Sequence, residues 1–393
     1  MRRTLASIAL VCSLLVAGCG QTRDDPAHEL QARLAAMLDD TAQCPSGTSA
    51  DLRALLRTTA QESVVHIPAG CYEVTGSITI PDGTVVAGAG MDKTILYRDP
   101  SNSSGQGEPI FSASGAQRGA THVSGIAFVG VRNTNDAGED SAIILRDRQD
   151  FRVDHCYFEG FGWAAVRVEG ASHGVIDHSI FVDNFKRAID NLGYGVAVYG
   201  VNKWAEDPQA GSAEALFVED SVFSGCRHAI AASGGAHYVF RYNSVRGNVE
   251  ACSVDAHGPG FGWPHGTRYV EIYGNTLEDP VHKQCGIGIR GGDGVIFRNR
   301  LRGFTRPIVL ILEWGTPEDL RASYPAKDQV RDLWIWHNEI LDGSLSPEVD
   351  AEATGFIELG RDYYTEPKPG YEPYPYPHPL ATGGPFDAGA IPP

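Results

Sequence analysis

Apolar residues recur along most of the chain in short groups at regular spacing. One repeated pattern is an apolar residue, two variable residues, then Cys, Ser or Asn, followed by further apolar positions. The pattern starts at Val153, Ile176, Val218, Phe240, Ile272, Ile296 and Ile335. Successive starts lie 23, 42, 22, 32, 24 and 39 residues apart. The short intervals indicate one structural repeat, and the long intervals indicate the same repeat with an inserted loop.

A second pattern, in which apolar and variable residues alternate, precedes the first. It occurs in residues Ala142–Asp147, Ala165–Gly170, Gly286–Gly291 and Gly355–Gly360. This alternation predicts a short strand with one face inward. Strands this short cannot bury a face alone, but strands stacked in successive coils share a core and satisfy each other's backbone groups. The two patterns together therefore predict a parallel β-solenoid.

Asparagine recurs at one place in the repeat, at Asn243, Asn275, Asn299 and Asn338. We expect these residues to form an interior ladder at one turn, with stacked amides bonding along the axis. A β-propeller or a β-sandwich fits the pattern less well. Those folds need hairpin turns, with blades of about 40 residues or strands spaced by about 8–12 residues.

The first repeats resemble those of a known superfamily. The segments Val65–Val74 and Ile78–Gly90 are similar to the first coils of the pectin-lyase-like superfamily. The resemblance implies an all-β fold, a single-stranded right-handed parallel β-helix. Residues Ser49–Arg57 would be its N-terminal capping helix, with Ser49 or Asp51 near the start. The resemblance is less specific for chemistry, since one fold hosts many functions.

The N-terminus has the features of an export signal. Two arginines precede an apolar run, Leu5–Val16, which predicts a secretory signal peptide. The run is shorter than the roughly 20 residues that cross a bilayer. The sequence Val16-Ala-Gly-Cys19 resembles a bacterial lipoprotein box, which implies that Cys19 is lipidated and becomes the mature N-terminus. Gly20 then implies the outer membrane or cell surface; ordinary signal cleavage is the alternative.

The chain is therefore expected to have four regions. They are a signal peptide at residues 1–18, a tether with a short helical segment at 19–44, the β-helix at 45–360, and a Pro- and Tyr-rich tail at 361–393. The tail cannot extend a sheet regularly, and we expect it to lie over the last coils or to hang free. A solenoid capped at both ends is expected to be a monomer.

Charge and cysteines limit the possible partners. The net charge of −17 becomes −19 when residues 1–18 are removed with their two arginines. Nucleic acid is therefore not expected as a partner, because its binding requires a basic face. Six cysteines remain beyond Cys12 and Cys19, and their spacing matches no zinc pattern. Export permits disulfides, and the pair Cys44–Cys71 is the expected one.

One acidic run is a possible calcium site. Residues Thr134–Asp140 offer clustered oxygens of the kind that bind Ca²⁺. A solvated loop is the more common explanation for such a run. No other cofactor is expected.

Stacked strands place outward side chains in columns about 4.8 Å apart. The expected column contains Arg146, Arg167 with Glu169, Tyr199, Ser233, Asp255, Arg290 and Glu313. Asp255 and His257 lie on one side of a strand, and Arg290 falls one coil later. An insertion between them carries Trp263 and His265, followed by Arg268. The residues bordering this region are Arg241, Glu271, His282 and Lys283.

These residue types suit uronic-acid chemistry. Removal of the proton beside a sugar carboxylate requires that the carboxylate be neutralised, which Arg290 and Arg268 would do. His257 or Lys283 would act as base, and Asp255 would orient His257. The remaining substrate contacts would come from Trp263, which stacks on a sugar ring, and from His265, Arg241, Glu271 and Tyr199. The expected activity is a lyase that cleaves an acidic polysaccharide by abstraction at C5 and β-elimination.

Three alternatives remain at this stage. Asp255-Ala256-His257 is similar to the Asp-Pro-His of mannuronan C5-epimerases, with Ala in place of Pro and without the flanking tyrosine pattern. The polygalacturonase motifs are absent, so hydrolysis is not expected. A non-catalytic glycan-binding or surface structural protein is the second alternative. In the third, Asp255 and His257 cap a turn and Arg290 forms a surface ion pair.

One Asp-His pair is repeated outside this region. Asp154-His155 and Asp177-His178 occur at the same place in two repeats. Repetition in register indicates a surface ladder rather than two catalytic sites.

Overall fold

A computed structural model describes most of the chain beyond the N-terminus. The described residues are 26–39, 46–57, 64–98, 108–115, 121–131, 140–185, 192–247, 251–260, 263–279, 281, 285–313, 328–343 and 347–382. Within these residues, no helix is long and apolar enough to span a membrane. The expected signal peptide and Cys19 lie outside this range.

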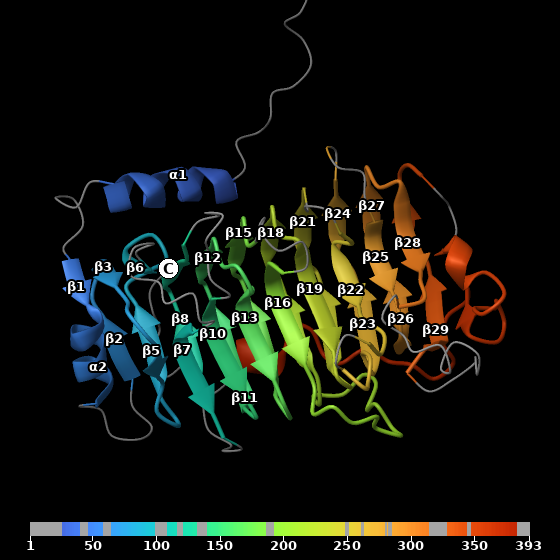
Figure 1. The fold of residues 1–393 in the computed structure, drawn as a ribbon, viewed down its shortest axis with the longest axis horizontal. Coiled ribbons are helices and arrows are strands. Elements are labelled where there is room, and N and C mark those ends of the chain that lie inside the picture. The colour runs from blue at the N-terminus through green and yellow to red at the C-terminus, as the bar shows by residue number, and fades with distance from the viewer. Residues whose placement is uncertain are drawn as a thin grey trace, which may run out of the picture.

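The described strands form three parallel sheets of 11, 11 and 10 strands, here called sheets A, B and C. Each regular coil adds one strand to sheet B, then to sheet A, then to sheet C, and the sheets run side by side along a common axis (Figure 1). Every strand pairs in parallel with the matching strand of the next coil, as Ile143 does with Val166. The chain is a right-handed parallel β-helix, so the predicted solenoid is confirmed.

The strands of each sheet are as follows. Sheet A contains β1 (Ser46–Thr48), β3 (Gly70–Glu73), β6 (Thr94–Tyr97), β9 (Ala127–Val129), β12 (Tyr157–Glu159), β15 (Ile180–Val182), β18 (Val222–Ser224), β21 (Ser244–Arg246), β24 (Thr276–Glu278), β27 (Arg300–Arg302) and β30 (Glu339–Ile340). Sheet B contains β2 (Val64–Ile67), β5 (Val85–Gly88), β8 (His122–Ser124), β11 (Gln149–Asp154), β14 (His173–Asp177), β17 (Leu216–Glu219), β20 (His237–Arg241), β23 (Tyr269–Tyr273), β26 (Gly292–Phe297), β29 (Val330–Trp336) and β32 (Tyr363–Tyr364). Sheet C contains β4 (Ile78–Thr79), β7 (Pro109–Ser114), β10 (Ser141–Arg146), β13 (Ala164–Glu169), β16 (Tyr194–Tyr199), β19 (His228–Ser233), β22 (Val254–Ala256), β25 (Cys285–Ile289), β28 (Arg306–Leu310) and β31 (Glu348–Val349).

The interior is one continuous apolar core along the axis. Phenylalanines stack from coil to coil, with ring centroids 5.2 Å apart for Phe128 and Phe158 and 4.8 Å apart for Phe158 and Phe181. Phe181 and Phe223 continue the stack at 4.5 Å. Because each coil buries its apolar face only against its neighbours, stacking supplies the main stabilisation of the fold.

The asparagine ladder is confirmed at the turn between sheets B and A. The Nδ2 atom of Asn243 donates to Oδ1 of Asn275 at 3.2 Å, and Asn275 and Asn299 donate in the same way to Asn299 and Asn338 at 2.9 Å. The same Oδ1 atoms accept backbone N–H groups of the neighbouring coil. An unsatisfied buried amide would cost about 1–3 kcal/mol, so the ladder makes this tight turn compatible with burial.

A helix closes the N-terminal end of the β-helix. The predicted capping helix is observed as α2 (Ser49–Arg57), which places Leu52 and Leu56 in the core. Its first turn is held by Thr48 and Asp51: the backbone N–H of Thr48 donates to Asp51 Oδ2 at 2.7 Å. The Thr48 hydroxyl accepts from the Asp51 N–H at 3.4 Å, a reciprocal capping box.

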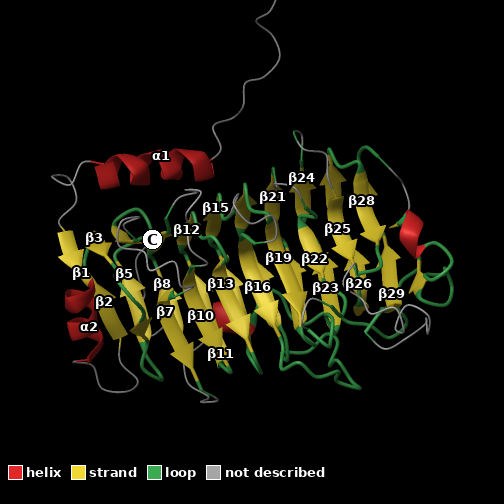
Figure 2. Cartoon of the chain, viewed as in Figure 1, coloured by secondary structure: helices red, strands yellow, loops and turns green. Residues whose placement is uncertain are grey.

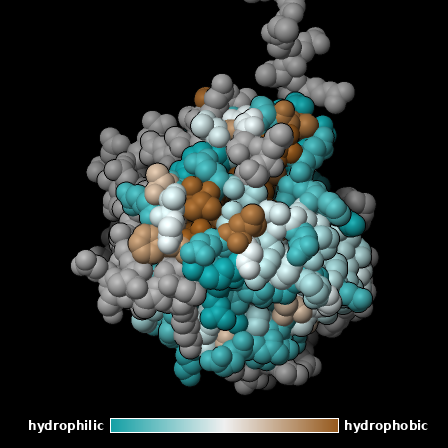
Figure 3. All heavy atoms as spheres, turned by 90° about the vertical axis from the view of Figure 1, so that its right-hand side faces the viewer, coloured by the Kyte–Doolittle hydropathy of each residue, from teal (hydrophilic) through white to brown (hydrophobic). Residues whose placement is uncertain are grey.

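The other end is closed by the segment around the short 3-10 helix η2 (Ala351–Ala353). Ala353 and Ile357 belong to the core cluster. Viewed at this end, apolar side chains lie within a mainly polar surface (Figure 3).

Two segments cover outer faces of the β-helix. Helix α1 (Pro26–Asp39) lies along sheet A, where Leu34 and Ala27 join Ile95 and Tyr157 in a small apolar cluster (Figure 2). The C-terminal segment first adds β32 to sheet B, which the sequence did not predict; residues 365–382 then lie on the outer face of sheet B and end in the 3-10 helix η3 (Pro379–Ala381). η3 packs against β11 and β14, so the tail reaches well beyond the last coils.

The described cysteines differ from expectation in one respect. Cys252 and Cys285 form a disulfide that the sequence did not predict. Cys71 is also disulfide-bonded, and Cys44, its expected partner, lies outside the described residues. Cys156 and Cys226 are buried thiols.

Candidate functional site

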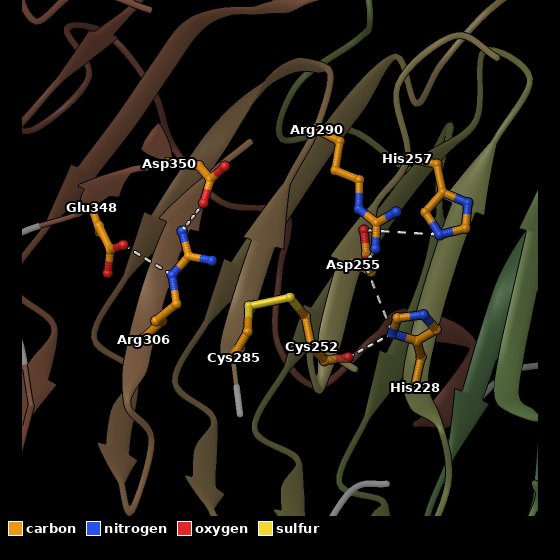
Figure 4. The surroundings of a disulfide bond; sticks show 9 residues. All are labelled: His228, Cys252, Asp255, His257, Cys285, Arg290, Arg306, Glu348 and Asp350. Atoms are coloured by element: carbon orange, nitrogen blue, oxygen red, sulfur yellow. Dashed lines mark hydrogen bonds and ion pairs between the residues drawn. A yellow bond between two sulfur atoms is a disulfide. The ribbon is translucent and has the colours of Figure 1, made fainter. Parts of the chain in front are cut away.

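Three successive coils bring a polar cluster together on the outer face of sheet C. β19 begins with His228, β22 carries Asp255 and is followed by His257, and Arg290 follows β25. Figure 4 shows that the four side chains gather in one place. Asp255 pairs with Ala231 on one side and Gly288 on the other. Because both neighbours in the column are small, side chains of the adjacent coils can reach the Asp255 carboxylate.

The centre of the cluster is a chain of alternating charges. Arg290 donates from Nη2 to Asp255 Oδ2 at 2.7 Å and from Nη1 to Glu313 Oε1 at 3.3 Å. The side chains of Asp255, Arg290 and Glu313 are 0%, 11% and 2% exposed. Burial raises the pKa of Asp255 against the opposing charges of Arg290 and Arg227. This is not the plain surface pair considered from the sequence, because its charges are almost fully removed from water.

Two histidines flank the Asp255 carboxylate. His257 Nε2 lies 3.9 Å from Asp255 Oδ1, and His228 Nδ1 lies 3.8 Å from Oδ2. Burial lowers the pKa of His257 to about 3 and that of His228 well below its usual value. Both imidazoles are therefore uncharged at neutral pH. The His257 side chain keeps 25% of its surface exposed, whereas Asp255 and His228 are closed to solvent.

Asp255 does not hydrogen-bond His257 in the described geometry. The separation of 3.9 Å exceeds hydrogen-bond length, so the expected orientation of His257 by Asp255 requires closure of the two groups. Such contacts in a ligand-free site often tighten only when substrate binds.

Three residues of this region were missed at the sequence level. They are His228, Tyr194 and Arg227: His228 pairs with Tyr194 across the coils, and their rings stack at 5.2 Å. Arg227 donates to the Tyr194 hydroxyl at 3.3 Å, and its charge lowers the pKa of Asp255 and His257 after the larger effects of burial and Arg290. The sequence signal for these residues was Arg227-His228 at the start of a strand of small residues. Its register with Asp255 could not be predicted, because the lengths of the loops between the coils were unknown.

The disulfide lies next to this cluster. It joins Cys252, three residues before Asp255, to Cys285, at the start of the strand that precedes Arg290 (Figure 4). The Cys252 carbonyl accepts a hydrogen bond from His228 Nδ1 at 2.5 Å. The bond therefore links the coils that supply the carboxylate and the guanidinium.

Tyr199 and Trp263 lie on the same sheet C face, as expected. Their rings stack with centroids 5.0 Å apart and planes 7° apart. Tyr199 pairs with Ser233, and the His257 N–H donates to the neighbouring Ala232 carbonyl, so Tyr199 is in the column of His257 and Trp263 stacks on it. Trp163 donates from Nε1 to the Tyr199 hydroxyl at 3.1 Å.

His265 and Arg268 are engaged away from Asp255. His265 Nδ1 lies 2.7 Å from Asp328 Oδ2. Arg268 pairs with Asp293 at 2.7 Å, donates to two backbone carbonyls, and lies 4.5 Å from the centroid of the Trp204 ring. Arg268 is almost fully buried, so its charge serves this corner of the fold rather than the cluster.

Arg241 and Glu271 lie on sheet B rather than at the border of the cluster. Arg241 donates to Glu219 at 2.6 Å and to the carbonyls of Tyr374 and Pro375. Glu271 accepts from the Gly211 N–H at 2.8 Å and from the Tyr371 hydroxyl at 2.5 Å. Both residues hold the C-terminal segment. Their placement follows from the winding, because residues close in sequence belong to different sheets.

Several expected residues lie outside the described part of the chain. Lys283 and His282 are among them, as are residues 134–139 of the possible calcium run. Asp140, the last residue of that run, accepts the Gly162 N–H at 3.0 Å. The repeated Asp-His pairs form the expected ladder, with the rings of His155 and His178 stacked at 5.2 Å.

The winding of three parallel sheets, with a polar cluster on one outer face, defines a pectate-lyase-like β-helix. Residues 46–290 match the family model described as rhamnogalacturonase A/epimerase, pectate lyase-like. The chain therefore belongs to this family. A comparison with curated protein sequences gave no match.

Several solved structures are similar to the chain at low sequence identity. The catalytic unit of a thermostable GH87 alpha-1,3-glucanase from Streptomyces thermodiastaticus has a TM-score of 0.50 and 12% identity, over 83% of this chain and 66% of that one. Alginate lyase from Paenibacillus sp. gives 0.49 and 12%, over 78% and 98%. The A-module of mannuronan C-5 epimerase AlgE4 from Azotobacter vinelandii gives 0.45 and 14%, over 80% and 90%.

Proposed function

We propose that this chain is a polysaccharide lyase that acts on a uronate-containing polymer at the sheet C cluster. The observation that carries the proposal is the position of His257, an imidazole a quarter exposed beside the buried chain Asp255–Arg290–Glu313. Membership of a family described by polysaccharide-active enzymes supports a carbohydrate polymer as substrate.

The reaction would proceed by proton abstraction and elimination. His257 accepts the C5 proton on Nδ1, the ring nitrogen that does not face buried Asp255; the C5–H electron pair forms the C4–C5 double bond, and the C4–O4 bond breaks. The leaving oxygen takes a proton from water or from the imidazolium formed in the first step. A sugar carboxylate bound beside His257 would favour its protonated form, which raises its basicity above that of the ligand-free protein.

The charge of the sugar carboxylate must be neutralised for this step. Arg290 was expected to do so, but its guanidinium is already paired with Asp255 and Glu313. We assign the first contact to Arg227, which is half-buried and contributes a positive charge at Asp255 and His257. Arg290 would hold Asp255 in place, and its positive charge would further stabilise the sugar carboxylate. Arg268 is given no role, because Asp293 occupies it.

The neighbouring coils offer a track for further sugars. Tyr199 and Trp263 present stacked rings in the column of His257, and Arg167 lies 4.1 Å from the centroid of the Trp163 ring. Aromatic rings of this kind suit the apolar faces of sugars. Arg167 is paired with Glu169, so it is assigned no sugar carboxylate.

Incubation with a panel of alginate, pectate, rhamnogalacturonan and glucuronan polymers tests the proposal. We expect an ultraviolet-absorbing unsaturated end to accumulate with one of them. His257→Ala should reduce this activity by about 10²- to 10⁴-fold, the usual contribution of a general base. His155→Ala, at a half-exposed histidine that also neighbours an aspartate, is the matched control and should leave activity unchanged. Full activity in His257→Ala would contradict the assignment.

Epimerisation at C5 is the second candidate, favoured by the Asp255-Ala256-His257 sequence. It uses the same abstraction but returns a proton to C5. Incubation in deuterated water separates the two: an epimerase incorporates deuterium at C5 without shortening the polymer, whereas a lyase produces shorter unsaturated chains. If the polymer binds and neither product forms, the chain is a glycan-binding protein.

We further propose that the protein is exported and anchored through a lipid on Cys19, with no other membrane contact, and that it is a monomer. The basis is the N-terminal sequence and the capped solenoid. Mass spectrometry of membrane-extracted protein should find a lipidated Cys19. Recovery of Cys19→Ala only in the membrane fraction would contradict the anchor.

A further inference from the structure

Three ligand-type atoms in the sheet C cluster have no hydrogen-bond partner among the described residues. They are His228 Nε2, Asp255 Oδ1 and His257 Nε2, and each is buried at the atomic level. Buried polar atoms are nearly always paired, because an unpaired one costs free energy. Three such atoms around one carboxylate therefore point to a ligand that binds all of them.

The hydrogen bond of His228 fixes which nitrogen is available. A carbonyl oxygen can only accept, so His228 Nδ1 donates its proton to Cys252 O at 2.5 Å. The lone pair of the uncharged ring is then on Nε2. Metal-binding histidines characteristically donate their second ring N–H to a carbonyl or carboxylate in this way, which fixes the ring orientation.

The three side chains lie close enough together to share one ligand once their rings adjust. One ligand atom from each of His228, Asp255 and His257 can be chosen so that all lie within 4.8 Å of one another. In a tetrahedral site with bonds near 2.1 Å, the ligand atoms lie about 3.4 Å apart. Rotation of the partly exposed His257 side chain can supply much of the difference, since Asp255 and His228 are fully buried.

We propose that His228, Asp255 and His257 bind one divalent transition-metal ion, with Zn²⁺ as the best match. Two imidazoles and one carboxylate are the donor set that zinc, cobalt and nickel prefer, whereas calcium and magnesium prefer oxygen ligands. Asp255 Oδ2 would remain with Arg290 while Oδ1 binds the ion, so Arg290 becomes the outer partner of a ligating carboxylate.

Nearby charge limits the affinity of this site. Arg290 and Arg227 both act electrostatically on Asp255 and His257, and their positive charges oppose a cation. Glu313, which pairs with Arg290, offsets part of this opposition.

Occupancy by a metal excludes the base role of His257, because a neutral imidazole that binds the ion through Nε2 carries its proton on Nδ1 and cannot accept another there. Metal would therefore inhibit the lyase reaction. This consequence rests on the proposed function, whereas the binding site itself does not.

Titration of tag-free, metal-stripped full chain with Co²⁺ and Zn²⁺ tests the site. We expect binding of one ion per chain, with the intense visible absorption of four-coordinate Co²⁺. His257→Ala and Asp255→Asn should weaken binding at least about 10-fold. His178→Ala, at a half-exposed histidine bonded to Asp177, is the control and should bind like the wild type. His257→Ala is decisive, because a partly exposed side chain can be removed without unfolding the chain; circular dichroism checks this.

Absence of one-to-one binding, or binding unaffected by His257→Ala, would overturn the site. If a polymer substrate is found, one equivalent of Zn²⁺ should abolish cleavage and EDTA should restore it. Metal binding without any lyase or epimerase activity would support the metal site and contradict the proposed function. Undiminished cleavage by the metal-saturated protein would contradict the inference that a bound metal prevents His257 from acting as base.

Discussion

Buried charges lie on the outer faces of both sheet B and sheet C, but their surroundings differ. On sheet B, Glu219 uses one oxygen for Arg241 and the other for the His378 N–H. Glu271 likewise has partners at both oxygens. On sheet C, Asp255 has a partner at Oδ2 and none among the described residues at Oδ1.

This difference in hydrogen-bond partners distinguishes a structural network from a candidate functional site in this fold. The C-terminal segment completes the partners of Glu219 and Glu271, since Tyr371 and His378 supply donors to these two carboxylates. The sheet C cluster lacks such completion and remains open at His257. A buried charge in a column is therefore no marker of function by itself; an incomplete set of partners beside an exposed group is the better marker.

The largest expected effect is on polymer cleavage, and it differs between two buried carboxylates, one on each sheet. Asp255→Asn should reduce polymer cleavage by about 10²-fold or more, because the amide no longer balances Arg290 or supports a positive His257. Glu219→Gln on sheet B should leave the activity of the folded protein unchanged. Measurement of kcat/KM for both variants, corrected for the folded fraction, checks this. Equal losses in the two variants would erase the distinction between the faces.

Arg241→Ala should have the next largest effect, on stability. It leaves Glu219 buried without its cation, which typically costs about 3–5 kcal/mol, and it releases two carbonyls of the C-terminal segment. Denaturant unfolding and limited proteolysis of the tail measure both consequences. Arg246→Ala, at a half-exposed side chain in β21, is the control and should cost less than about 1 kcal/mol. A stable Arg241→Ala with a protected tail would be inconsistent with this account.

The pH dependence of the unfolding free energy should reflect the ionisation of Glu271 on sheet B. Burial tends to raise the pKa of Glu271, but the bonds from His237 and Tyr371 outweigh it and lower the pKa below its usual value of 4.5. A depressed pKa contributes stability that is present above the unfolded value and lost as pH falls through the folded one. The unfolding free energy should therefore fall below about pH 4.5, and fall less steeply in Glu271→Gln. Parallel curves for the two proteins would refute this contribution.

The smallest expected effect concerns the aromatic track. Trp263→Ala removes one of two stacked rings from the column of His257, so KM should rise by about 3- to 10-fold while kcat changes little. Trp334→Ala on sheet B, where the ring stacks on Tyr364, should leave KM unchanged. A rise in KM for Trp334→Ala alone would place the substrate on the other face.

The winding and its core were predictable because each coil repeats one apolar pattern. The asparagine ladder followed from recurrence of Asn243, Asn275, Asn299 and Asn338, and the capping helix from Ser49–Arg57. The contact between Asp255 and Arg290 was also correct. The single column expected for them was wrong, because Asp255 pairs with Gly288 and Arg290 is therefore level with His257.

The rest of the site depended on loop lengths and packing that the period does not contain. His228 was missed because two long insertions separate the coils before β19. Arg241 and Glu271 were placed on the wrong sheet because neighbours in sequence turn onto different faces. The reach of the tail could not be foreseen, because its docking depends on individual hydrogen bonds to Arg241 and Glu219.

The central claim is that substrate binds on the outer face of sheet C around His257. Hydrogen–deuterium exchange of His257→Ala, with and without a uronate oligosaccharide from the polymer that the wild type cleaves, tests it most directly. We predict slower exchange in the segments around β19, β22 and β25 and no change in β20, β23 or residues 363–382. Protection confined to sheet B and the C-terminal segment would contradict the account.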